Sequence, residues 1–138
     1  KSAISFIKVI LVAKNEFVTY LDEVKHDEIP KLLSSAHIFA FASSCENMPN
    51  TLIEAMSMGL PIACSNKGPM PEILRNGGVY FDPSSPISIR KAIEKIISDS
   101  EYREKISKLA IKNSNEFSWE ISANRLFSAL SELANKYN

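Results

Sequence analysis

Two carboxylates, Glu46 and Glu54, stand in a stretch of the sequence that carries almost no other charge. Between His37 and Asn66 they are the only acidic residues, and neither lysine nor arginine occurs there. Burying an ionised carboxylate without a partner costs several kcal/mol, so an apolar segment that keeps two of them requires an explanation. One explanation is that the pair accepts hydrogen bonds from vicinal hydroxyls, one acid on a sugar ring and the other on a ribose. The other is that both side chains are simply solvated, and the residues alone leave these alternatives open.

The residues between the two carboxylates predict a helix that begins at Pro49 or Asn50, directly after an apolar strand. The unpaired amides and the dipole at such a helix start can hold a phosphate, and Asn50 and Thr51 can add side-chain hydrogen bonds. The chain has four glycines, and they form neither a G-x-G-x-x-G nor a G-x-x-x-x-G-K-[ST] motif. The two common glycine-loop phosphate sites are therefore excluded.

Apolar strands alternate with helices along the chain, which predicts an α/β fold with a doubly wound, mostly parallel sheet and helices on both faces. Residues 37–42 and 60–64 are predicted as strands buried on both faces, and residues 79–81 as a short strand. Gly59 is expected to end one helix and Ser118 to cap another. The helices are predicted at residues 29–36, 49–58, 71–75, 86–97, 102–114 and 119–137.

The first residues give conflicting signals. The β-branched residues within 2–13 favour a strand, whereas the polar residues Ser2, Ser5 and Lys8 recur every three positions and favour one face of a helix. We favour the helix there. Residues 18–21 are predicted as a short strand that follows a turn.

Composition describes one ordinary globular domain of 138 residues. The 16 basic and 16 acidic residues balance, and no basic block is interleaved with aromatics, so nucleic-acid binding has little support. No apolar run approaches the ~20 residues of a spanning helix. Two cysteines, Cys45 and Cys64, lack CxxC spacing and are expected to be small buried residues. His26 and His37 lie too far apart in sequence to suggest a metal site.

The segment from Glu46 to Ile62 resembles the E-x7-E signature of retaining, nucleotide-sugar-dependent glycosyltransferases of the GT-B fold, of the family 4-like or "group 1" type. Flanking segments resemble further landmarks of that family in the same order, from about Val18 to Trp119. These segments are residues 20–24, 32–39, 71–73, 76–78 and 81–83. The resemblance implies a single domain over residues 1–138, the Rossmann-like, donor-binding part of such an enzyme, incomplete at its N-terminus.

By this resemblance, Glu46 is the catalytic candidate and contacts hydroxyls of the donor sugar, while Glu54 binds the ribose of the nucleotide. Leu21 and Val24 are expected beside the nucleotide base. The family transfers a glycosyl group with retention of configuration and without a metal. We therefore expect no cofactor and no metal, and the chain contains no Asp-x-Asp. The backbone amides expected to face the sugar and the diphosphate are those around Asn47, Met48, Asn50, Thr51 and Leu52.

The chain departs from the family pattern in several places. Asn47 stands where the family often has glycine, and Gly68 is followed by Pro69 where the family usually has a second glycine. We therefore expect Glu72 to stabilise a helix start and not to bind a ligand. The family's N-terminal acceptor domain, and the early strand whose loop carries Arg and Lys for the diphosphate, are absent. We expect this chain to be part of a longer enzyme and to be inactive alone.

The resemblance implies two partners, a nucleotide-sugar donor and a glycan or lipid-linked acceptor that the missing N-terminal domain would hold. It leaves room for peripheral membrane association of the full enzyme, which we expect in the cytoplasm or at the inner face of the membrane. Two alternatives stay open. One is a GT-B-type epimerase or hydrolase that uses the same nucleotide-sugar site. The other is a non-catalytic α/β module such as a receiver-like domain, although the clustered acids of a receiver are not seen beside Asp22 or Glu46.

Overall fold

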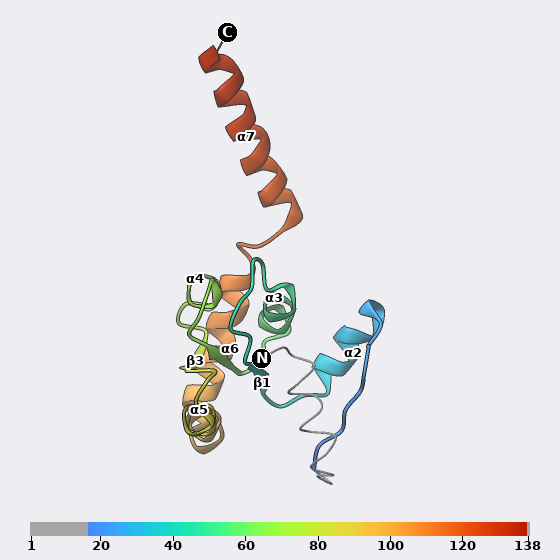
Figure 1. The fold of residues 1–138 in the computed structure, drawn as a ribbon, viewed down its shortest axis with the longest axis vertical. Helices are drawn as coiled ribbons and strands as arrows, with labels where there is room; N and C mark the ends of the chain where they lie inside the picture. The colour runs from blue at the N-terminus through green and yellow to red at the C-terminus, as the bar shows by residue number, and fades with distance from the viewer. Residues whose placement is uncertain (1–16, 138) are drawn as a thin grey trace.

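The computed structural model describes residues 17–137, which form a parallel sheet in the order β1-β2-β3 with helices on both of its faces (Figure 1). The predicted α/β fold is confirmed. The helix favoured at residues 2–13 lies outside the described residues. In chain order the elements are the short 3-10 helix η1 (His26–Glu28), α2 (Ile29–Ser34), β1 (Phe39–Phe41), α3 (Asn50–Ser57), β2 (Ile62–Ser65), α4 (Met70–Leu74), β3 (Gly78–Phe81), α5 (Pro86–Ser98), α6 (Ser100–Ser114) and α7 (Trp119–Tyr137).

The middle strand β2 carries the core, because all four of its residues are buried. It pairs in parallel with β1, where Phe39 lies opposite Ile62, and with β3, where Ser65 lies opposite Phe81. Its side chains alternate between two apolar clusters. Ile62 and Cys64 belong to the cluster that also contains residues of α3 and α4, whereas Ala63 packs with residues of α5. A strand that is apolar on both faces is typical of a parallel sheet covered on both sides.

Helix α3 packs one face into the core and ends as the sequence predicts. Leu52, Ala55 and Met56 are fully buried, and their spacing places them on one side of the helix. Gly59 adopts a φ of +69° after the last turn. Its amide donates to Met56 O at 3.0 Å and the amide of Leu60 donates to Ala55 O at 3.2 Å, which is the Schellman ending of a helix.

Two predicted strands differ from the structure. Residues 18–21 form no strand, because no described segment pairs with them and their side chains are exposed. The strand predicted over residues 37–42 is limited to Phe39–Phe41. It was expected to be buried on both faces, but Ala40 is exposed and its two neighbours are half-buried. The reason is that β1 is an edge strand of the described sheet. It has β2 as its neighbour on one side and no described strand on the other, so its side chains are covered less than those of the middle strand.

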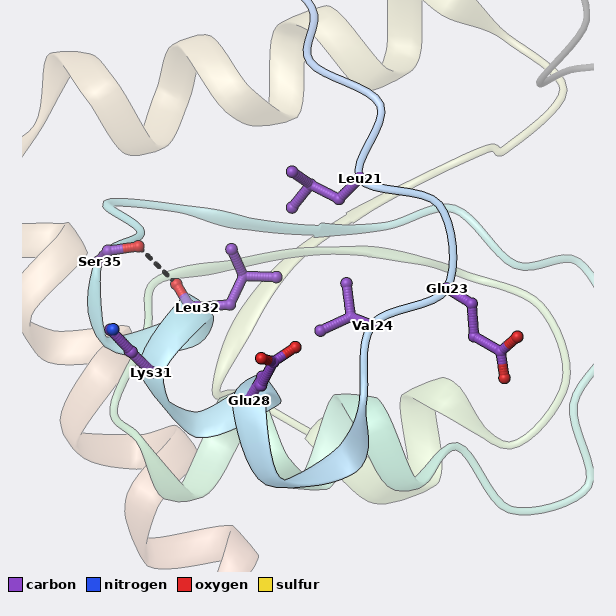
Figure 2. A pocket seen from close by; sticks show the side chains of 7 residues that line it. All are labelled: Leu21, Glu23, Val24, Glu28, Lys31, Leu32 and Ser35. Carbon is purple, nitrogen blue, oxygen red and sulfur yellow. Dashed lines mark hydrogen bonds between the residues drawn. The ribbon is translucent and has the colours of Figure 1, made fainter.

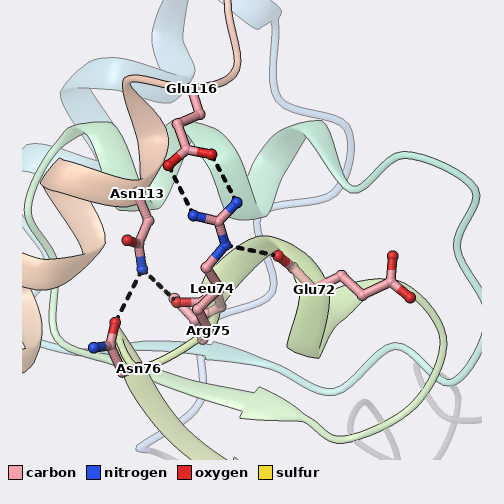
Figure 3. A network of polar contacts seen from close by, with 6 residues as sticks. All are labelled: Glu72, Leu74, Arg75, Asn76, Asn113 and Glu116. Carbon is pink, nitrogen blue, oxygen red and sulfur yellow. Dashed lines mark hydrogen bonds and ion pairs between the residues drawn. The ribbon is translucent and has the colours of Figure 1, made fainter.

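Helix α6 closes tightly over the end of α4 (Figure 3). The Leu74 carbonyl accepts hydrogen bonds from the Gly77 amide and from Asn113 Nδ2, each at 2.9 Å. The Arg75 guanidinium donates to both carboxylate oxygens of Glu116 at 2.8 and 2.7 Å, and this pairing lowers the pKa of Glu116. Both side chains of the pair are about half exposed, so its net contribution to stability is small.

Helix α7 extends away from the sheet and its covering helices (Figure 1). The Ser118 hydroxyl accepts from the Ile121 amide at 3.1 Å, which confirms the predicted cap. No described residue of α7 is buried. Six of its large apolar side chains are more than half exposed, namely Trp119, Leu126, Phe127, Leu130, Leu133 and Tyr137. Within residues 17–137, no helix combines the length and the apolar character that crossing a bilayer requires.

The two cysteines differ in environment. Cys64 lies in the centre of β2 and is fully buried, and this desolvation raises the pKa of its thiol to about 12. Cys45 lies in the loop after β1 and is exposed. The expectation that both cysteines are buried is therefore wrong for Cys45, because the loop carries it beyond the end of the strand to the surface.

We predict that Gly77→Ala lowers the free energy of unfolding by about 1–3 kcal/mol. A Cβ at this position would lie 2.8 Å from Ala110 Cα and 2.9 Å from Ala110 N, and the backbone of α6 cannot move aside cheaply. Urea denaturation measures the difference, with the exposed Ser84→Ala as the control, expected within about 0.5 kcal/mol of the parent. Equal stability of Gly77→Ala and the parent would contradict the close packing of α6 on this turn.

We also predict that iodoacetamide at about pH 8 modifies Cys45 in the native protein and leaves Cys64 unmodified. Cys45 is exposed to the reagent, whereas Cys64 is buried and burial raises the pKa of its thiol to about 12. Mass spectrometry of the labelled peptides distinguishes the two sites. Cys45→Ser should abolish labelling until urea unfolds the chain. Rapid labelling of Cys64 in the native state would show that β2 is not closed.

Candidate functional site

The loops that follow β1 and β2 meet at one edge of the sheet. Parallel strands place their carboxyl ends on the same side, and this edge is where open α/β sheets bind ligands. Residues 42–49 link β1 to α3, and residues 66–69 link β2 to α4. Gly68, at a φ of +55°, lies against the first loop, since a Cβ added there would be 3.9 Å from both the N and the O of Glu46. Glu46 thus lies where the first loop meets the second, at the carboxyl edge of the sheet.

Glu46 is half-buried in its loop. Within the part of the chain that the structure describes, none of the ion pairs or hydrogen bonds found involves its carboxylate. A partly desolvated carboxylate without a protein partner retains its full capacity to accept hydrogen bonds from a ligand. This is the first of the two acids that the sequence singled out.

The helix start between the two acids is open to solvent. The residue before α3 is the buried Pro49, and no side chain caps the first turn. Asn47, Asn50 and Thr51 are exposed, and Met48 is 47% exposed. These residues surround a helix end whose amides and dipole favour an anion.

Leu52 belongs to the core and not to this surface. Its side chain is fully buried, and its amide already donates to Pro49 O at 3.0 Å. The Leu52 amide is therefore already paired, and Leu52 can attract a ligand only as part of the positive end of the helix dipole.

Glu54 lies one turn further along α3 and faces a cavity of about 210 Å³ between α2 and α3. Its side chain is 32% exposed, and Oε1 lies 3.9 Å from Nδ1 of His26. The other residues around this cavity are Ile29, Pro30, Leu33, Ser57 and Met58. No pattern in the sequence indicates this contact of His26, because the two residues lie on different elements and their spacing along the chain does not show that they meet.

Leu21 and Val24 line a different cavity, of about 420 Å³. Figure 2 shows their side chains directed toward Leu32 of α2, so that the three form an apolar wall. Glu28 and Lys31 add charge at its border. The structure therefore brings the two residues predicted beside the base into one cavity, but neither of them lines the cavity that Glu54 faces.

Glu72 lies in the first turn of α4 and is exposed, as expected for an acid near a helix start. Its carboxylate points away from Arg75 and Glu116 (Figure 3). Among residues 17–137, no group of three or more His, Cys, Asp or Glu side chains is arranged to hold a metal ion.

Comparison with known proteins identifies the family of this chain. The family described as "Glycosyl transferases group 1" matches residues 11–113, which is more than half of the chain. The O-antigen chain mannosyltransferase B of Escherichia coli is 31% identical over 104 residues, a region covering 75% of this chain and 27% of that protein. This chain therefore spans less than a third of the length of that relative.

Two solved structures share the fold. Sucrose-phosphate synthase from Thermosynechococcus elongatus superposes with a TM-score of 0.81 at 21% identity, covering 96% of this chain and 34% of its own. Anabaena HepE, solved in complex with UDP and glucose, superposes with a TM-score of 0.78 at 21% identity, covering 92% of this chain and 35% of its own. These similarities confirm the predicted Rossmann-like half of a GT-B fold, and the family match shows that this chain belongs to the group 1 glycosyltransferases.

Proposed function

We propose that this chain is the part of a retaining glycosyltransferase that binds the nucleotide-sugar donor. The observation that carries the proposal is the arrangement of Glu46 and Glu54 on either side of the uncapped start of α3, at the carboxyl edge of a parallel sheet. One of these two acids, Glu46, is partly buried and has no protein partner in the described chain. HepE, which shares the fold, was solved with UDP and glucose, a combination that this arrangement would suit.

In the proposed complex, the diphosphate lies at the start of α3. The Thr51 amide donates to its oxygens, and the helix dipole favours its charge. The Asn50 amide already donates to Met48 O at 3.0 Å, so Asn50 contributes through its side chain. When the bond from the sugar to the diphosphate breaks, negative charge grows on the leaving oxygen. Donors that are already oriented toward that position stabilise the transition state more than the ground state.

The two acids then have separate roles. Glu54 accepts hydrogen bonds from the ribose hydroxyls, and Glu46 accepts them from hydroxyls of the donor sugar and orients it for attack. No step in this scheme draws on a metal or on another cofactor.

The remainder of the reaction belongs to parts of the protein beyond these residues. We propose that the acceptor is a glycan or a lipid-linked glycan bound by a second domain, and that the 138-residue chain alone does not turn over. The E. coli relative is by name an O-antigen chain mannosyltransferase, which supports hexosyl transfer in polysaccharide synthesis as the proposed reaction class.

We predict that, in the full protein, Glu54→Gln weakens the binding of nucleoside diphosphates about tenfold or more, because hydrogen bonds to a charged group are worth about 1.5–3 kcal/mol. Glu46→Gln should leave diphosphate affinity within about twofold and lower the rate of sugar transfer about 10²-fold, since its contacts are made to the sugar. Calorimetry with UDP, GDP and ADP gives the affinities, and product formation from nucleotide sugars gives the rate.

Glu72→Gln is the matched control, because Glu72 is an exposed acid at the start of the neighbouring helix α4. It should change neither quantity. Unchanged diphosphate affinity in Glu54→Gln would remove the ribose role, and unchanged transfer in Glu46→Gln would remove the sugar role.

A further inference from the structure

A histidine from a separate element faces the carboxylate that we assign to the ribose. His26 begins η1, and its Nδ1 lies 3.9 Å from Oε1 of Glu54 on α3. Both residues line the cavity between α2 and α3. We propose that His26 is a positioning residue for Glu54, and that nucleotide binding at this site therefore depends on the protonation of His26. This inference rests on the proposed function, because it concerns how Glu54 is held when it binds the ribose.

The charges around this pair leave few competitors. His26 and Glu54 are the two titratable residues that line the cavity, and its other lining residues are apolar apart from a serine. Of the neighbouring charged residues, Glu28 and Lys31 line the separate cavity that contains Leu21 and Val24. Lys25 and Asp27, which flank His26 in the chain, are exposed and line neither cavity. Within the described part of the chain, the ion pair to His26 is made by Glu54.

The backbone of His26 is hydrogen-bonded to the start of α2, whereas its side chain is exposed. The His26 carbonyl accepts a hydrogen bond from the Ile29 amide, which joins η1 to the start of α2. The side chain itself is 85% exposed, so removing the ring takes nothing from the core. The backbone of His26 is therefore held at the start of α2, and its ring is accessible to solvent.

Protonation changes this pair in one direction. Imidazole ordinarily titrates between pH 5 and 8, a range over which carboxylates ordinarily stay ionised. At 3.9 Å the neutral ring makes no hydrogen bond to Glu54, whereas the imidazolium is drawn to Oε1. A carboxylate has about four acceptor positions, so an imidazolium on Oε1 restricts its rotation and leaves capacity for ribose hydroxyls. A carboxylate ordered in this way binds the ribose more tightly, so nucleotide affinity rises as the pH falls.

The test is calorimetry of UDP, GDP and ADP binding to the full protein at about pH 8 and about pH 5.5. The ratio of the two affinities is compared among the parent, His26→Asn, Glu54→Gln and the double variant. Titration of the ligand itself cancels when each ratio is divided by that of the parent. His37→Asn is the matched control, because His37 is the other histidine of the chain and precedes β1 at the opposite edge of the sheet.

We expect the parent to bind about two- to fivefold tighter at the lower pH than His26→Asn does, once each is normalised to its affinity at the higher pH. His37→Asn should behave as the parent. In the Glu54→Gln background, the additional His26→Asn change should have no further effect on the ratio, because the histidine acts through the carboxylate.

A parent-like ratio in His26→Asn would overturn the inference. So would an equal effect of His26→Asn with and without Glu54, which would place the action of the histidine directly on the phosphates. Failure of the proposed function looks different. In that case no diphosphate binds the parent at either pH, or Glu54→Gln binds as tightly as the parent.

Discussion

The whole arrangement depends on β2 being buried on both faces while it is hydrogen-bonded in parallel on both sides. Ile62–Ser65 has no exposed residue, and its neighbours β1 and β3 run in the same direction. Three strands that run the same way must end at one edge. This constraint brings together the loop with Glu46, the loop with Gly68 and the start of α3, and Gly68 then lies against the backbone of Glu46.

Helix α3 both packs into the core and carries part of the proposed ligand site. One face contributes Leu52, Ala55 and Met56 to the core, which fixes the axis of the helix against the sheet. A helix anchored in this way presents its first turn and Glu54 with little freedom, as a preorganised ligand site requires. Gly59 ends the helix so that the chain can return to β2 at once, and a larger residue would meet Ile111 Cδ1 at 2.8 Å.

Most of the structure around α3 and β2 could be predicted from the sequence, because it depends on residues that are close together in the chain. The apolar spacing of α3, the stop at Gly59 and the apolar run of β2 each reflect a short stretch of chain. The incorrect predictions concern residues whose environment is set by segments distant in the chain. Residues 18–21 have strand-like composition but no paired neighbour in the described chain, and Ala40 is exposed because β1 is an edge. His26 of η1 and Glu54 of α3 meet at the cavity between α2 and α3, and no periodic pattern in the sequence predicts a contact of this kind.

The central claim is that a nucleotide sugar binds at the carboxyl edge, around the start of α3. Hydrogen–deuterium exchange of the full protein, with and without UDP, GDP or ADP, tests it most directly. We expect a nucleotide that binds there to slow exchange in peptides that cover residues 43–58 and to leave exchange in residues 83–98 unchanged. Protection confined to residues 83–98, which contain the lining of a separate cavity at the start of α5, would contradict this placement of the ligand.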